Sequence, residues 1–110
     1  MAKTGQNFIH FKSRFRQVVF FIEDVDTLTG FKAYWGMAEN ETSAPLVSKS
    51  SEGVAPGIEL SGQDVIVTLD PADTTSLVPA KYYHELKLID INENPLTPAI
   101  GEVDLRPVTL

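Results

Sequence analysis

The sequence predicts an all-β protein, an antiparallel sandwich of about seven strands. Short apolar stretches alternate with polar residues at a period of two, and Gly- and Pro-containing turns separate them. Helix signals are few, and no βα unit repeats. Because strands of this kind place one face on a core, we expect two sheets packed face to face.

The clearest pair of strands covers residues 64–70 and 80–90. In the first strand, the side chains that alternate onto one face are Val65, Val67 and Leu69. In the second strand, they are Tyr82, His84, Leu86 and Leu88. The connector between the strands begins with a proline and is rich in Asp, Thr and Ser, which predicts a short capped turn. We expect this turn to carry the chain from one sheet to the opposite sheet.

The remaining strands are expected at residues 7–12, 15–23, 31–37, 58–60 and 100–108, and residues 46–49 are a candidate for an additional short edge strand. Residues 1–6 are small and polar, so they are expected to form a flexible N-terminal arm. A chain of 110 residues is the usual length of one domain, and we assign residues 7–110 to a single β-sandwich domain.

Residues 15–23 form an unusual strand, because both of its faces are apolar. Val19 and Phe21 are on one face of the strand, and Val18, Phe20 and Ile22 are on the other face. A strand that is apolar on both faces is expected to be covered on both. The outer cover must then come from the arm, from a loop or from another subunit.

Two clusters of outward apolar side chains are therefore candidate partner-binding surfaces. One combines Val19, Phe21 and Ile66, and the other combines Tyr34, Tyr83 and Ile89. Contiguous exposed apolar groups of this kind mark interfaces. We favour contact between molecules, which makes a homo-oligomer the expected state, over cover by the arm or by the loop at residues 40–57.

Arg14 and Arg16 flank Phe15 at the start of the same strand. They are candidates for a basic contact with an acidic partner. An equally good interpretation is that they are edge-strand charges that discourage aggregation.

Composition excludes other classes of function. The net charge is −6, which disfavours non-specific binding to nucleic acid. The longest apolar run, residues 18–22, is far too short to span a membrane, and the N-terminus lacks the apolar segment of a signal peptide. The expected site of synthesis and assembly is the cytosol.

No catalytic constellation is visible, so we expect neither enzymatic activity nor a cofactor. The chain has no cysteine, no Gly-x-Ser-x-Gly elbow and no phosphate-binding glycine loop. Asp24 with Asp26, and Asp70 with Asp73, could supply oxygen ligands to calcium, but the spacing of an EF-hand is absent. Acidic turn residues are common as caps, and no metal site is expected.

Two aromatic residues favour an immunoglobulin-like layout of the sandwich. Trp35 lies on the third strand, where such domains bury a tryptophan, and Tyr82 opens the sixth, where a tyrosine hydroxyl bonds to nearby backbone. The cysteine pair of antibody domains is absent, so the expectation concerns the wider fold.

The region from about Phe15 to Val108 resembles the small β-sandwich modules of tailed-phage virions. These include the N-terminal domain of baseplate upper proteins and related tail-fibre or head-fibre modules. The residues that carry the resemblance are Arg16, Val18, Phe20, Ile22, residues 28–30, Trp35, Val65, Val67, Leu69, Asp73, Thr74, Leu77, residues 79–82, Glu85, Leu86 and residues 101–103.

The resemblance implies a bacteriophage virion structural protein without catalytic activity. The function expected from it is that of a decoration or attachment subunit that binds the capsid or tail surface, and its location is the virion. A baseplate or tail-fibre adaptor is one alternative. The other, suggested by Tyr34 and Tyr83, is a carbohydrate-binding module, because sugars stack on exposed aromatic rings; its partner would be a host glycan.

Overall fold

The computed structural model describes residues 6–23, 25–53 and 57–108, so the predicted arm lies outside the described residues except for Gln6. The described residues form eight strands and one short helix. The elements are β1 (Phe8–Phe11), β2 (Arg16–Phe21), β3 (Lys32–Ala38), β4 (Val47–Ser50), β5 (Ile58–Ser61), β6 (Asp64–Leu69), α1 (Pro71–Thr74), β7 (Ala80–Ile89) and β8 (Pro95–Arg106). The structure therefore confirms the all-β class, with one strand more than the expected seven.

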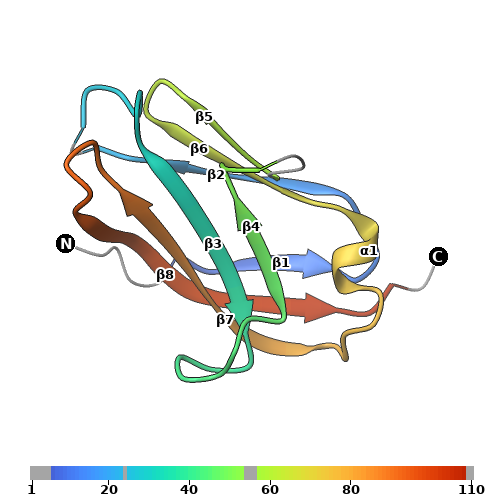
Figure 1. Ribbon diagram of the computed structural model, residues 1–110. Coiled ribbons are helices and arrows are strands. Elements are labelled where there is room, and N and C mark those ends of the chain that lie inside the picture. The colour runs from blue at the N-terminus through green and yellow to red at the C-terminus, as the bar shows by residue number, and fades with distance from the viewer. Residues whose placement is uncertain (1–5, 24, 54–56, 109–110) are drawn as a thin grey trace.

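The strands form two sheets. One has five strands in the order β1-β8-β7-β3-β4, and the other has three in the order β2-β6-β5. In Figure 1 the three-stranded sheet lies above the lower strands of the larger sheet. The connector α1 joins β6 of one sheet to β7 of the other, as predicted.

The expectation of purely antiparallel pairing is wrong at one edge of the larger sheet. β1 runs parallel to β8, with Phe8 opposite Val103 and Phe11 opposite Arg106. The two strands lie at opposite ends of the chain, so no hairpin forces them to be antiparallel. Parallel pairing needs only a long connection, and the rest of the domain provides it.

β8 also begins earlier than the predicted residue 100. Its first residue is Pro95, which lies opposite Ile89 of β7. Before it, the Asp90 carboxylate accepts hydrogen bonds from the backbone amides of Asn92 (2.8 Å) and Asn94 (2.9 Å), which stabilise the turn between β7 and β8. The prolines at 95 and 98 hid this strand from the sequence pattern, because proline cannot donate to a sheet ladder.

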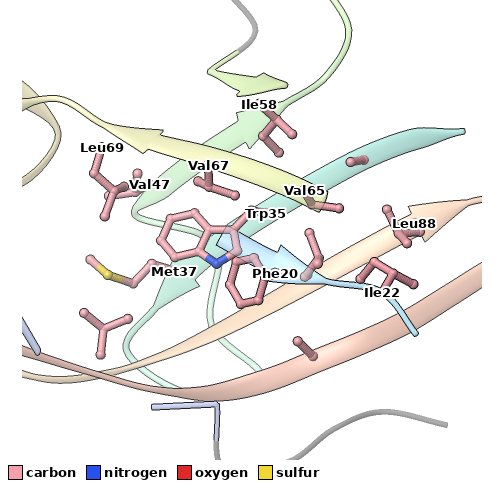
Figure 2. Close-up of a cluster of buried hydrophobic side chains, with 14 of the residues drawn as sticks. Phe20, Ile22, Trp35, Met37, Val47, Ile58, Val65, Val67, Leu69 and Leu88 are labelled. Carbon is pink, nitrogen blue, oxygen red and sulfur yellow. The ribbon is translucent and has the colours of Figure 1, made fainter. Parts of the chain in front are cut away.

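The core lies between the two sheets, and Figure 2 shows Trp35 among side chains from both of them. Trp35 is only 2% exposed. All the side chains that were predicted to face inward on β6 and β7 are buried: Val65, Val67, Leu69, Tyr82, His84, Leu86 and Leu88. The Tyr82 hydroxyl donates a hydrogen bond to the carbonyl of Val78, which is the corner contact expected from the sequence.

The short helix α1 is fixed at its start and to the sheet beside it. The backbone amide of Asp70 donates to the Asp73 carboxylate at 2.7 Å, which satisfies a group at the helix start. The same carboxylate forms an ion pair with Lys49 of β4 at 2.7 Å. Asp73 is therefore occupied by structural contacts within the chain.

The segment that precedes β1 is attached to the sheet by a buried network around His84. The indole Nε1 of Trp35 donates to His84 Nδ1 at 3.1 Å, so the imidazole proton lies on Nε2 and is donated to the carbonyl of Gln6. Gln6 also donates its amide to the carbonyl of Ile100 at 3.1 Å. The network thus joins the domain centre to the start of the described chain.

Because of its two buried histidines, His10 and His84, the protein is expected to lose stability as the solution is acidified. Burial lowers the pKa of His84, opposed in part by its bond to Gln6. Burial and the nearby Arg16 charge also lower the pKa of His10, while Asp73 acts in the opposite direction. The unfolded chain therefore binds protons more tightly than the folded chain. The free energy of unfolding should be greatest above the ordinary histidine pKa of about 6.5 and should fall below it.

Urea unfolding at a series of pH values between about 8 and 5 measures this effect. Each histidine contributes at most about 1.4 kcal/mol per pH unit to the slope of the free energy of unfolding against pH. The pKa of Asp90 is lowered by its bonds to the amides of Asn94 and Asn92, so its stabilising effect is lost only in more acidic solution. A variant that combines His10→Phe with His84→Gln should show a flatter profile. An unchanged profile in that variant would contradict the assignment to these histidines.

Candidate functional site

The outer face of the three-stranded sheet carries the first predicted cluster, which we call the apolar patch: Val19, Phe21 and Ile66. Val19 lies directly opposite Ile66 in the β2–β6 ladder, and Phe21 lies two residues further along the same face. Val19 and Phe21 are each 55% exposed, and Ile66 is half-buried. The structure therefore brings the three predicted residues together.

No described segment covers the apolar patch. The described part of the loop at residues 40–57 lies against the other sheet, where β4 pairs with β3. The alternative that this loop covers one of the two clusters therefore does not apply, in its described residues, to the cluster of Val19, Phe21 and Ile66. Polar side chains frame the patch, with Thr68 opposite Gln17, Asp64 opposite Phe21 and Glu59 opposite Ile66. An apolar centre with a polar border is the usual composition of a protein interface.

The two arginines lie at the edge between the sheets. The Arg16 guanidinium donates to the carbonyl of Ile9 at 2.8 Å and lies 5.2 Å from the centre of the Phe8 ring. Arg16 thereby links β2 to β1 across the open side of the two sheets, which gives it a structural contact within the chain. Arg14 is exposed in the turn between these strands. Phe15, which the sequence analysis did not select, is 62% exposed beside them.

The three residues of the second predicted cluster lie on the outer face of the larger sheet. Tyr34 lies opposite Lys87, Tyr83 opposite Ala38, and Ile89 opposite Lys32. Tyr34 and Tyr83 both line a groove on the outer face of this sheet, but Ile89 does not. Ile89 lies two residues from Lys87, the partner of Tyr34, and therefore shares the outer face with both tyrosines, but only the tyrosines line the groove.

The groove has a volume of about 440 Å³. Its floor includes Gly36 of β3, which has no side chain to fill the space. Gly36 lies between Tyr34 and Ala38, and Ala38 is the residue opposite Tyr83. The polar lining of the groove comes from the loop after β3, from β4 and the residues that follow it, and from β7, and consists of Asn40, Glu41, Ser43, Ser48, Lys49, Ser50, Glu52, Glu85 and Lys87. Gly36 was not predictable as a residue of this groove, because a glycine within a strand carries no chemical signal of its own.

Tyr83 is held by a hydrogen bond within this groove. Its hydroxyl donates to the Glu85 carboxylate at 2.8 Å. Partial burial, this bond and the charges of Glu85 and Glu41 raise the pKa of Tyr83 to about 12. The hydroxyl therefore stays protonated at physiological pH and is a hydrogen-bonding group rather than a base or a nucleophile.

The described residues contain no group of three or more His, Asp or Glu side chains placed to hold a metal ion. Asp24, one of the calcium candidates, lies outside the described residues. Within the described ranges, no helix is long and apolar enough to cross a bilayer. No protein-family model matches the chain, and neither does any curated protein sequence.

Proposed function

We propose that the chain is a bacteriophage virion structural protein, a small immunoglobulin-like subunit that binds the capsid or tail surface through protein contacts. The observation that carries the proposal is the apolar patch. Two large side chains, Val19 and Phe21, stay more than half exposed beside Ile66 on an otherwise polar sheet face. Burying that surface against other virion subunits, including further copies of this chain, would remove apolar area from water.

The strand order supports the immunoglobulin-like part of the proposal. In such domains one sheet holds strands B, E and D, and the other holds G, F, C and C′. The order β2-β6-β5 fits the first, and the order β8-β7-β3-β4 fits the second. Trp35 then occupies strand C, and Tyr82 forms its corner bond on strand F.

The position of the missing disulfide supports the same assignment. The second cysteine of antibody domains lies two residues after the corner tyrosine and bonds to strand B. Here that position is His84, whose ring centre lies 5.9 Å from that of Phe20 on β2. It lies 5.9 Å from that of Trp35 as well. We infer that a ring contact between the sheets replaces the covalent bond.

Two matched variants test the assembly role. Phe21→Ser removes the central ring of the apolar patch, and Phe11→Ser removes a ring of similar exposure, 49%, on the edge strand of the other sheet. Because neither ring is buried, we expect little change in the free energy of unfolding. Virions purified from the source of the gene should contain the wild-type chain and the Phe11 variant, but at least about tenfold less of the Phe21 variant, a loss equivalent to about 1.4 kcal/mol of contact free energy.

Absence of the wild-type protein from purified virions would contradict the proposal. Equal incorporation of the two variants would contradict the assignment of the contact to the apolar patch, while leaving a virion location in place.

A further inference from the structure

We propose that the groove on the outer face of the five-stranded sheet binds a neutral oligosaccharide. This site lies on the opposite sheet from the apolar patch, so it adds a second binding function to the proposed assembly role and does not depend on it. The inference is carried by the shape of the groove, by its two aromatic side chains and by the mixture of its polar groups.

The shape of the groove depends on Gly36. A Cβ atom added there would lie 3.7 Å from Pro45 in ordinary contact, so the glycine is not required by crowding. Because Gly36 has no side chain, the floor of the groove stays open between Tyr34 on β3 and Tyr83 on β7. The volume of about 440 Å³ lies within the range of small-molecule sites.

The two tyrosines suit a flat ligand with apolar faces. Tyr34 and Ala38, the partner of Tyr83, are four residues apart on β3, which corresponds to about 13 Å along the strand. Both rings are half-buried, so each keeps part of its surface available to a ligand. The C–H face of a sugar ring packs on such an aromatic surface, and its hydroxyls remain at the edge of the ring to form hydrogen bonds.

The polar lining suits hydroxyl groups better than a charged ligand. A hydroxyl both donates and accepts, and the groove offers carboxylate acceptors in Glu41 and Glu85, an ammonium donor in Lys87 and an amide in Asn40 that does both. The groove also contains Glu52, whereas the ammonium of Lys49 is already paired with Asp73. The carboxylates therefore outnumber the remaining ammonium group, which disfavours an anionic sugar, and the donors and acceptors together suit the hydroxyls of a neutral sugar.

A second hollow indicates a ligand longer than one sugar ring. It has a volume of about 550 Å³ and shares Asn40, Glu41 and Tyr83 with the groove. Tyr83 thus lies at the boundary between two adjoining spaces. An oligosaccharide that crosses Tyr83 would use both spaces, whereas a monosaccharide would occupy only one.

Titration of the full chain with a panel of neutral tetrasaccharides, built from glucose, mannose, galactose or N-acetylglucosamine, tests the proposal by calorimetry and NMR. We expect saturable binding of at least one probe and ring-proton shifts for Tyr34 and Tyr83. Gly36→Val fills the floor with a residue that suits a strand and should weaken binding by at least about tenfold without lowering the melting temperature. Phe21→Ser is the matched control on the other sheet and should bind the same probe as wild type.

The proposal would be overturned if none of the tetrasaccharides bound at about 10 mM, because that concentration exceeds the dissociation constant of even a weak, millimolar complex. So would sugar binding that Gly36→Val leaves unchanged. A salt-sensitive interaction with a tetralysine peptide in place of sugar binding would show that the groove selects cations, and would also overturn it. None of these results alters the virion test, which depends on the apolar patch.

Discussion

Replacing Trp35 with alanine is expected to lower the free energy of unfolding by about 3–5 kcal/mol. Trp35 is almost completely buried and contacts core residues of both sheets, so truncation leaves a cavity that rigid strands cannot close. A domain of this size is usually stable by about 5–15 kcal/mol, which places the variant near the limit of folding. Urea unfolding followed by circular dichroism measures the loss.

Trp35→Phe separates packing from hydrogen bonding at the same site. Phenylalanine keeps an aromatic ring in the core but leaves His84 Nδ1 without its donor, which should cost about 1–3 kcal/mol in addition to a smaller packing loss. We therefore expect Trp35→Phe to lie between wild type and Trp35→Ala. A phenylalanine variant as stable as wild type would contradict the role assigned to the bond between Trp35 and His84.

The second large effect is expected from Gly101→Ala. A Cβ atom at this position would lie only 2.6 Å from the carbonyl carbon of Gln6, and the obstacle is backbone rather than a flexible side chain. The segment before β1 must therefore move away from β8. The movement should break the bonds that Gln6 makes to Ile100 and His84, and the 2.8 Å bond from the Glu102 amide to the Asn7 side chain.

Loss of these three bonds should lower stability by about 2–4 kcal/mol, at about 1 kcal/mol for each. Hydrogen exchange at Gln6 and along β1 should become faster, while exchange in β6 stays slow. Gly36→Ala is the matched control, because the same methyl group meets only ordinary contacts there and should change stability by less than about 1 kcal/mol. Equal exchange at β1 in both variants would contradict the close approach of Gln6 to β8.

The sequence predicted the parts of this fold that follow from local alternation. Strands β6 and β7 have one apolar face each, and the residues predicted to be inward, such as Val67 and Leu86, are buried. The turn at Pro71 was predictable because proline and Asp73 together specify a capped start. The parallel partner of β1 was not, because pairing between the two ends of a chain leaves no local pattern.

The candidate sites were predictable to a similar extent. Val19, Phe21 and Ile66 were correctly grouped, since period-two alternation fixes the face of each side chain and the pairing of β2 with β6 brings the three together. Ile89 shares the outer face with the tyrosines, as alternation predicts, but it does not line the groove, whose outline depends on the loop after β3. The contact from Arg16 to Ile9 depends on how the two sheets are stacked, which the sequence does not encode locally.

We propose that the outer face of the three-stranded sheet is buried by neighbouring virion proteins. Hydroxyl-radical footprinting of the free chain and of purified virions tests it most directly, because Phe21 and Phe11 have similar exposure in the free chain. We predict that oxidation of Phe21 falls at least about fivefold in virions, as expected for a ring removed from water, while oxidation of Phe11 changes little. Equal oxidation of Phe21 in the free chain and in virions would contradict the claim.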